Sequence, residues 1–335
     1  MDTQRPEQNM LNVFSGPGAM RDFFNPDHAP FLPLIELPES LNPFAKSHVR
    51  IFAKLAYLLP LLNIKSLPAY NMMLKAEQEG KLKGVDTIVE NSSGNTAFSL
   101  AIVAKLFGIQ NVQAIVPWDI APGKLELLRL AGAQPLLHKN EPGQSGGIEK
   151  ARIMGKEPNA FNPGQYENEA NPNAIEQWIA PQIWEQLHGT LTVFCAGLGT
   201  TGTILGASRF LKKQNEKIAV VGAIVAQDSA IPGVRTSERL KEIKFQWQGA
   251  VDHQVEVKTK DSFKKSLELC RAGLMAGPSS GFALAGLLSF LNQQPAQSLD
   301  ALRNENGDVV AAFVCPDTPL PYLDKYSTHL DPGDF

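Results

Sequence analysis

The sequence has 335 residues, of which 43% are hydrophobic and 19% charged, and its formal net charge is −3 at pH 7. This supplies enough apolar material for two large lobes, and the near balance of charge argues against a nucleic-acid or anionic-membrane partner. The first twelve residues are mostly polar, no apolar run is long enough to span a bilayer, and the three cysteines follow no zinc or disulfide spacing, so we expect a soluble cytoplasmic protein without a metal site.

Short β-branched runs alternate with helical segments along most of the chain. Such alternation is typical of parallel sheets with helices on both faces. We therefore expect an α/β fold with two three-layer αβα domains whose twisted sheets are mainly parallel. The smaller domain is expected over residues 51–170, and the larger over residues 1–50 and 171–335. The expected strands are 86–90, 112–116, a strand from 136, 191–195, 218–225 and 309–314, and the expected helices are 96–106, 122–131 and 203–213.

The first chemically distinctive residue along the chain is Lys65. It is the only charged residue between Lys54 and Lys75. An apolar environment lowers the pKa of a lysine, which suits a nucleophile that also carries protons. A surface lysine whose stem lies along apolar side chains would give the same pattern. Lys65 alone therefore leaves both interpretations open.

Five small polar residues, Ser92-Ser93-Gly94-Asn95-Thr96, lie between an expected strand and an expected helix. A helix cap needs only one such residue. The excess indicates an anion site at the helix N-terminus, of a kind suited to a carboxylate.

A glycine-rich turn, Gly197-Leu198-Gly199-Thr200-Thr201-Gly202-Thr203, follows the expected strand 191–195 and opens a helix. Glycines let several backbone N–H groups converge, and the helix N-terminus and threonine hydroxyls add to the attraction for a phosphate. A plain strand-to-helix turn and a dinucleotide-binding fingerprint stay open as alternatives. The fingerprint requires an acidic residue about twenty positions further on, and Asp228 lies farther along than that.

A fourth motif, Gly277-Pro278-Ser279-Ser280-Gly281, precedes an apolar helix and by itself indicates a turn with a helix cap. Taken together in this order, the four motifs resemble fold-type II enzymes that use pyridoxal 5'-phosphate (PLP). The match is best with the cysteine synthase and cystathionine β-synthase family of the tryptophan synthase β-subunit superfamily. The resemblance covers about Ile51 to Tyr322 and is carried by segments 55–65, 92–96, 165–172, 199–203 and 277–281.

The resemblance implies that PLP is bound through a Schiff base to Lys65, which also moves the α-proton of the substrate. Asn95 is then expected to bond the ring hydroxyl, and Ser279 the ring nitrogen. Because serine is a neutral partner, it need not keep that nitrogen protonated, which favours β-elimination over transamination. The residues expected to hold the phosphate are Gly199, Thr200, Thr201, Gly202 and Thr203. Those expected to hold the substrate carboxylate are Ser92, Ser93, Gly94, Thr96 and Gln165.

The match departs from the family close to Lys65. Leu61 and Leu62 stand where the family has two glycines, and we expect them to adopt ordinary backbone angles and to add bulk beside the cofactor. Ser66-Leu67 replace the family's Asp-Arg, and Thr201 replaces a glycine. These departures indicate a divergent member of the family.

The family's Gly-Ile-Gly loop, which lies over the substrate, is replaced here by residues 235–240. Arg235 and Arg239 are four positions apart, so a helix would place them on one face. There they could bind an anionic leaving group through paired hydrogen bonds. A solvated helix face is the alternative interpretation of the same pattern.

We therefore predict a PLP-dependent lyase or transferase that carries out β-elimination or β-replacement on an activated serine, with O-acetylserine or O-phosphoserine as the donor. The resemblance also implies a homodimer acting on a small amino-acid substrate. Three alternatives stay open: a serine or threonine dehydratase, a non-catalytic binding protein of the same fold, and an oxidoreductase that binds a nucleotide at the glycine-rich turn.

Overall fold

The computed structural model describes residues 11–139, 146–294 and 296–335. The described chain divides into two compact units. The smaller unit comprises the described residues up to Pro30 together with Lys65–Asn171, and the larger comprises Phe31–Ile64 together with Pro172–Phe335. The chain therefore passes from one unit to the other three times, and neither unit is one continuous stretch of sequence.

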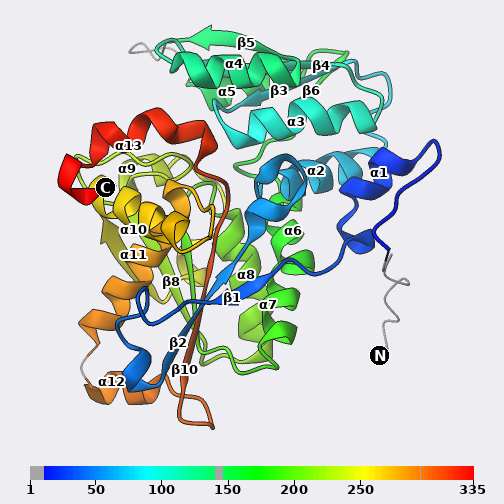
Figure 1. Ribbon diagram of the computed structural model, residues 1–335. Helices are drawn as coiled ribbons and strands as arrows, with labels where there is room; N and C mark the ends of the chain where they lie inside the picture. The colour runs from blue at the N-terminus through cyan, green and yellow to red at the C-terminus, as the bar shows by residue number, and fades with distance from the viewer. Residues whose placement is uncertain (1–10, 140–145, 295) are drawn as a thin grey trace. The chain divides into compact units, whose positions relative to one another are not determined.

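The smaller unit is built around a four-stranded parallel sheet (Figure 1). Its strands are β3 (Thr87–Asn91), β4 (Asn111–Pro117), β5 (Ala133–His138) and β6 (Ala160–Phe161), and its helices are α1 (Ala19–Phe24), α2 (Ser66–Gln78), α3 (Asn95–Leu106), α4 (Pro122–Ala131) and α5 (Gly147–Met154). The strand order is β5-β4-β3-β6. Val89 and Ile115 pack against Ala151 of α5. Because successive strand residues point to opposite faces, Glu90 lies on the face opposite to α5.

The larger unit contains a six-stranded sheet in the order β1-β2-β10-β7-β8-β9. All neighbouring strands are parallel except β1 and β2. The strands are β1 (Leu34–Glu36), β2 (Val49–Lys54), β7 (Val193–Gly197), β8 (Ala219–Val225), β9 (His253–Val257) and β10 (Val309–Val314). The helices, beginning with one that crosses the boundary between the units, are α6 (Ala170–Trp178), α7 (Ala180–Gln186), α8 (Gly202–Gln214), α9 (Ser237–Leu240), α10 (Thr259–Arg271), α11 (Pro278–Gln293), α12 (Ala296–Ala301) and α13 (Leu323–His329).

Helices cover both faces of the larger sheet. Figure 1 shows α10 and α11 on one face and α7 and α8 on the other. Every residue of β8 and β10 is buried, which explains why these strands appear in the sequence as continuous apolar runs. Helices α10 and α11 approach closely, because a Cβ atom on Gly281 would lie 2.1 Å from the carbonyl oxygen of Ser262.

The predicted fold class is confirmed: both sheets are mainly parallel and lie among helices. The helix predicted over 122–131 and the strand predicted over 309–314 have those bounds. The strand predicted from 136 begins three residues earlier, at Ala133, and the ends of the other predicted elements agree with the structure or differ by one or two residues. The division of the chain differs from the expected boundary at residue 51. Residues 49–54 form β2, a mostly buried strand that pairs with β10 in the larger sheet. The described residues from 11 to 30 instead join the smaller unit, where Arg21 lies over the ring of Phe107.

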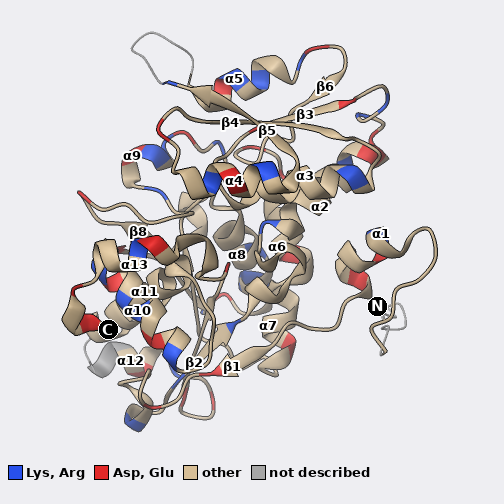
Figure 2. Cartoon of the chain, turned by 45° about the horizontal axis from the view of Figure 1, so that its top comes forward, with Lys and Arg blue, Asp and Glu red and all other residues tan. Residues whose placement is uncertain are grey.

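Charged residues of both signs are mixed on the helices of the smaller unit. Figure 2 shows acidic and basic residues interspersed along α4 and α5, where Arg129 pairs with Glu126 and Arg152 with Glu149. Across the residues that the structure describes, no helix combines the length and the apolar character that crossing a membrane would require.

Candidate active site

Lys65 lies at the point where the chain enters the smaller unit. It is half-buried and directly precedes Ser66, the first residue of α2, which packs against α3. The two residues before it are held by backbone hydrogen bonds within the larger unit. The N–H of Ile64 donates to the carbonyl of Pro316 at 2.7 Å, and Asn63 forms an antiparallel bridge with Asp317. The backbone on the N-terminal side of Lys65 is therefore fixed by a β-type interaction.

Leu61 and Leu62 do not adopt the ordinary backbone angles that we expected. Both have positive φ, 69° and 55°, so the prediction was wrong. A left-handed conformation costs an L-residue about 1–2 kcal/mol, and local hydrogen bonds hold it here. The side-chain amide of Asn63 donates to the carbonyl of Leu61 at 2.8 Å, and the N–H of Leu62 donates to the carbonyl of Leu59 at 3.0 Å. The chain thus keeps a backbone conformation that suits glycine while carrying leucines.

The polar loop 92–96 belongs to the smaller unit and ends at the start of α3. The Ser92 hydroxyl accepts a hydrogen bond from the N–H of Gly94 at 3.2 Å, so this bond does not use the hydroxyl proton of Ser92. Thr96 and Gln165 are brought together: the threonine hydroxyl donates to Gln165 Oε1 at 2.6 Å. Gln165 Nε2 in turn donates to the carbonyl of Asn91 at 3.1 Å. Distant parts of the sequence therefore meet at this loop.

A buried carboxylate that the motif reasoning missed supports the same loop. Glu90 is 1% exposed and accepts three backbone N–H groups: from Asn91 at 2.9 Å, from Gly164 at 3.0 Å and from Gln165 at 3.2 Å. Burial raises the pKa of Glu90 to about 7, and the hydrogen bonds from Gln165, Asn91 and Gly164 oppose that rise. The available sequence signal was a glutamate within a strand that is otherwise apolar.

The glycine-rich turn connects β7 to α8 in the larger unit. A Cβ atom on Gly199 would lie 2.3 Å from the carbonyl oxygen of Gly233, so only glycine allows this close approach of two backbones. Thr201 precedes α8 with φ 66°, a strained angle for a β-branched residue. Its buried Oγ1 has no hydrogen-bond partner within the described residues. The first N–H groups of α8 likewise have no acceptor inside the helix. Together these are donors arranged for an anion.

Ser279 lies in the first turn of α11 and is buried. Its hydroxyl donates to Asp317 Oδ1 at 2.9 Å, and the hydroxyl of Tyr322 donates to Asp317 Oδ2 at 2.7 Å. A Cβ atom on Gly277 would lie 2.8 Å from Asp317 Oδ1. The predicted serine is therefore part of a closely packed polar chain that ends on a carboxylate.

The expectation that Arg235 and Arg239 share a helix face was wrong. Helix α9 starts at Ser237, and Thr236 before it is extended and bridges to Val225. Arg235 is only 9% exposed, and its Nη1 donates to the carbonyl of Arg239 at 3.1 Å and to Glu242 Oε2 at 2.7 Å. The Arg235 guanidinium holds its own loop together, and Arg239 is exposed.

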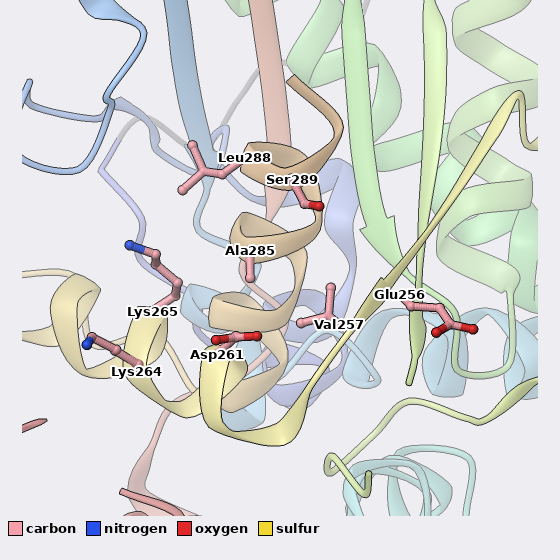
Figure 3. A pocket seen from close by; sticks show the side chains of 8 residues that line it. All are labelled: Glu256, Val257, Asp261, Lys264, Lys265, Ala285, Leu288 and Ser289. Atoms are coloured by element: carbon pink, nitrogen blue, oxygen red, sulfur yellow. The ribbon is translucent and has the colours of Figure 1, made fainter. Parts of the chain in front are cut away.

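A hollow of about 250 Å³ lies elsewhere in the larger unit, beside α10, α11 and β9. Figure 3 shows that Glu256 points away from Lys264 and Lys265. Lys264 pairs with Asp334, and Lys265 pairs with Glu268. Because these charges do not converge and no predicted site residue lines the hollow, we do not take it as the active site. Its lining is Glu256, Val257, Asp261, Lys264, Lys265, Ala285, Leu288 and Ser289.

Comparison with known proteins gives the family of the chain. Residues 29–308 match the model of the pyridoxal-phosphate dependent enzyme family. The chain belongs to this family. It is 33% identical over 279 residues to cysteine synthase B of Salmonella typhimurium, with 82% of this chain and 90% of the relative covered. It is also 33% identical over 294 residues to a cysteine synthase of Staphylococcus aureus, with 84% and 87% covered.

Solved structures agree with this family assignment. An O-ureido-L-serine synthase superposes with a TM-score of 0.77 at 25% identity, covering 90% of this chain and 94% of that chain. An O-acetylserine dependent cystathionine β-synthase from Helicobacter pylori superposes with a TM-score of 0.73 at 26% identity, covering 90% and 96%.

The glycine-rich turn of this PLP enzyme fits the phosphate group of the cofactor. Thr201 Oγ1 is a buried hydroxyl without a partner in the described chain, and the turn before it is held by the close approach of Gly199 to the backbone of Gly233. A phosphate would accept from the hydroxyl and from the first-turn N–H groups of α8, which would relieve the burial cost of those donors. The residues present are thus compatible with PLP.

Proposed function

We propose that this PLP enzyme catalyses β-elimination or β-replacement on an activated serine, such as O-acetylserine or O-phosphoserine. The buried Thr201 hydroxyl at the start of α8 carries the proposal, because it is a donor without a partner in the described chain and lies where a bound anion would accept from it. The names of the relatives support the substrate class, since cysteine, O-ureido-L-serine and O-acetylserine all share the three-carbon skeleton of serine with a substituent at Cβ.

Bound PLP supplies an electron sink for the electrons released at Cα of the amino acid. In our proposal, Lys65 carries the cofactor, and its freed amine takes the α-proton and holds it while the β-substituent leaves. Asn95 bonds the ring hydroxyl, and Ser279 faces the ring nitrogen. The phosphate is held by Gly199, Thr200, Thr201, Gly202 and Thr203.

The substrate carboxylate is assigned to the loop formed by Ser92, Ser93, Gly94 and Thr96, together with Gln165. Ser92 suits this role because its oxygen already accepts from Gly94, which leaves its proton to donate. The Thr96 proton is directed at Gln165 Oε1, so Thr96 serves the carboxylate through its first-turn N–H and by holding Gln165 in place. A charged substrate group then meets donors that are already oriented, which lowers the entropic cost of binding.

The backbone before Lys65 favours a catalytic protein over a non-catalytic one of the same fold. The leucines at 61 and 62 keep positive φ in spite of the strain. Strained backbone of this kind clusters at active sites, and here it lies directly before the lysine. We therefore infer that the leucines at 61 and 62 change the side chains beside Lys65 but leave the backbone of the catalytic site intact.

Borohydride reduction of the PLP-loaded protein, followed by peptide mass spectrometry, tests the central assignment. We expect the reduced cofactor on Lys65 and a colourless Lys65→Ala variant, with Lys75→Ala, in the helix that follows Lys65, as the matched control that stays labelled. Label on another lysine, or failure of the wild type to bind PLP, would contradict the proposal.

The substrate is tested separately by adding O-acetylserine, O-phosphoserine, serine and threonine in turn. With sulfide present, we expect a cysteine product from at least one of the two activated serines; without a nucleophile, we expect pyruvate and ammonia. Turnover of serine or threonine alone would instead identify a dehydratase. Failure of all four compounds to react or to change the visible spectrum would indicate a non-catalytic protein.

A further inference from the structure

An apolar surface lies on the N-terminal side of Lys65. Leu58 and Leu62 are 49% and 53% exposed, and Leu61 between them is half-buried. Leu62 stands three positions before Lys65, and three residues span at most about 10–11 Å. The side chain of Leu62 is therefore within reach of a substrate group held at the lysine.

A second segment of the larger unit extends this apolar surface. The backbone bridge between Asn63 and Asp317 joins the turn to the segment 318–323, where Leu320 is 56% exposed. Neither residues 55–64 nor residues 318–323 include a charged side chain. A charged substrate group therefore finds no ionic partner on either segment, whereas a hydrocarbon group would remove leucine surface from water.

The backbone holds the two leucines nearest to Lys65 in place before any ligand binds. Leu61 and Leu62 have φ of 69° and 55°, and the hydrogen bond from the Asn63 amide to the Leu61 carbonyl at 2.8 Å fixes this turn. The N–H of Leu62 is bound to the carbonyl of Leu59 at 3.0 Å. Because the turn is already ordered, a ligand that packs on these side chains pays little entropy for ordering them.

We propose that Leu61 and Leu62 are specificity-determining residues that favour an apolar nucleophile, namely an organic thiol with a hydrocarbon substituent. The inference rests on the proposed function and names its second substrate. With O-acetylserine as the donor, acetate leaves with the electrons of its bond to Cβ. The thiol sulfur then bonds to Cβ and loses its proton to solvent, and Lys65 returns the α-proton to Cα. The hydrocarbon group, now attached at Cβ, lies against the leucines.

Two thiols of equal size test this preference. 1-Butanethiol and 3-mercapto-1-propanol have the same number of heavy atoms and differ in a terminal methyl against a hydroxyl. The PLP-loaded full chain is given the activated serine that reacts with sulfide, the S-substituted cysteine is quantified by mass spectrometry, and the readout is the ratio of kcat/KM for the two thiols. We expect a ratio of about ten or more, the size of effect that a single apolar group has in a hydrophobic pocket. In Leu62→Gly the ratio should fall severalfold.

Leu62→Asn covers the case in which glycine loosens the turn, because asparagine tolerates a left-handed angle and presents a polar group; its ratio should fall at least as far. Leu130→Ala is the matched control, since it shortens a leucine that is 82% exposed on α4 and should keep the wild-type ratio.

A wild-type ratio near one, or a ratio that both Leu62 variants leave unchanged, would overturn the inference. If the variants instead lose dimers in size-exclusion chromatography at an unchanged ratio, a second copy of the chain covers the leucines, and the inference is equally wrong. These outcomes leave the proposed function standing, because it requires only that sulfide yields cysteine. A protein that forms no product with any nucleophile would contradict both.

Discussion

Replacing Glu90 with glutamine should separate the two effects of this buried carboxylate, which supports the loop at Gln165 and also carries the cost of burying a charge. The carboxylate accepts three backbone N–H groups, two on Oε2 and one on Oε1. Glutamine has a single carbonyl oxygen, so its amide nitrogen faces at least one of these N–H groups. An unpaired buried N–H costs about 1–3 kcal/mol. The loop that holds Gln165 should therefore be less firmly anchored in Glu90→Gln, and KM for the amino-acid substrate should rise severalfold.

Whereas the lost hydrogen bond should weaken the loop in Glu90→Gln, removing the buried charge should favour the variant at higher pH. Burial raises the pKa of Glu90 from 4.5 to about 7, so the folded protein binds this proton more tightly than the unfolded chain does. The resulting stabilisation is complete below about pH 4.5 and is lost as the pH rises through 7. At 1.36 kcal/mol per unit of pKa, the rise in the pKa of Glu90 corresponds to about 3 kcal/mol of pH-dependent stability. Glutamine does not titrate. As the pH rises from 5 to 8, the free energy of unfolding of Glu90→Gln should therefore increase relative to that of the wild type by up to about 3 kcal/mol.

Urea unfolding at pH 5 and pH 8 measures this difference, and hydrogen exchange of the peptide spanning residues 160–170 locates it. Glu157→Gln is the matched control, because it makes the same chemical change at an exposed site and should not alter the pH slope. Parallel stability profiles of wild type and Glu90→Gln from pH 5 to pH 8 would refute the reasoning. That result would mean that the three N–H groups fully offset the burial of the charge.

Three further substitutions test other strained or buried positions. Thr201→Gly relieves a left-handed angle that costs about 1–2 kcal/mol, and the greater entropy of glycine in the unfolded chain offsets about 0.5–1 kcal/mol of that gain. The substitution should raise the melting temperature of the cofactor-free protein and lower its affinity for PLP severalfold in a titration. An unchanged affinity would exclude a contact between Thr201 and the phosphate. Leu61→Gly should be neutral or slightly stabilising in urea, whereas Leu58→Gly, inside a short helix, should destabilise; equal losses would argue against strain at Leu61. Burial lowers the pKa of Lys54 from 10.5 to about 7, so the cost of burying its charge is full below pH 7 and vanishes towards pH 10.5. Lys54→Met removes this pH-dependent cost but leaves three oxygen acceptors without their donor, so its stability relative to the wild type should improve by roughly 2–4 kcal/mol from pH 10 to pH 6. A difference that does not change with pH would contradict this.

Lys54 shows what local sequence signals cannot provide. The sequence draws attention to the lone lysine at 65 and gives no local signal for Lys54, at the end of β2, although burial lowers the pKa of Lys54 to about 7. Lys54 is fully buried because Leu32, Gln182 and Gln186 surround its ammonium group with oxygen acceptors at 2.7–2.8 Å. Those partners are up to 132 positions away, so no window of sequence contains them.

The motifs themselves were found because their signals are local. Small polar residues at helix N-termini and glycines at a strand-to-helix turn occupy a few adjacent positions, and the structure places both 92–96 and 197–203 where a strand ends and a helix begins. The contacts of those side chains could not be predicted from the local sequence, because the hydrogen bonds of Thr96 to Gln165 and of Ser279 to Asp317 join residues 69 and 38 positions apart. The angles of Leu61 and Leu62 were mispredicted because residue preference was taken to outweigh the hydrogen bonds that hold the turn.

The pairing of β2 with β10 constrains how the chain can fold while it is being synthesised. The smaller unit is complete once Asn171 has been added, but β2 acquires its central neighbour only when residues 309–314 exist. At roughly 5–20 residues per second, the 254 residues between Lys54 and Val309 take about 10–50 s to add. During that time a strand with five of six residues destined for burial has β1 on one edge and nothing on the other. A nascent chain stalled in this interval is the species that a holdase chaperone should bind, and the segment it should cover is residues 49–54.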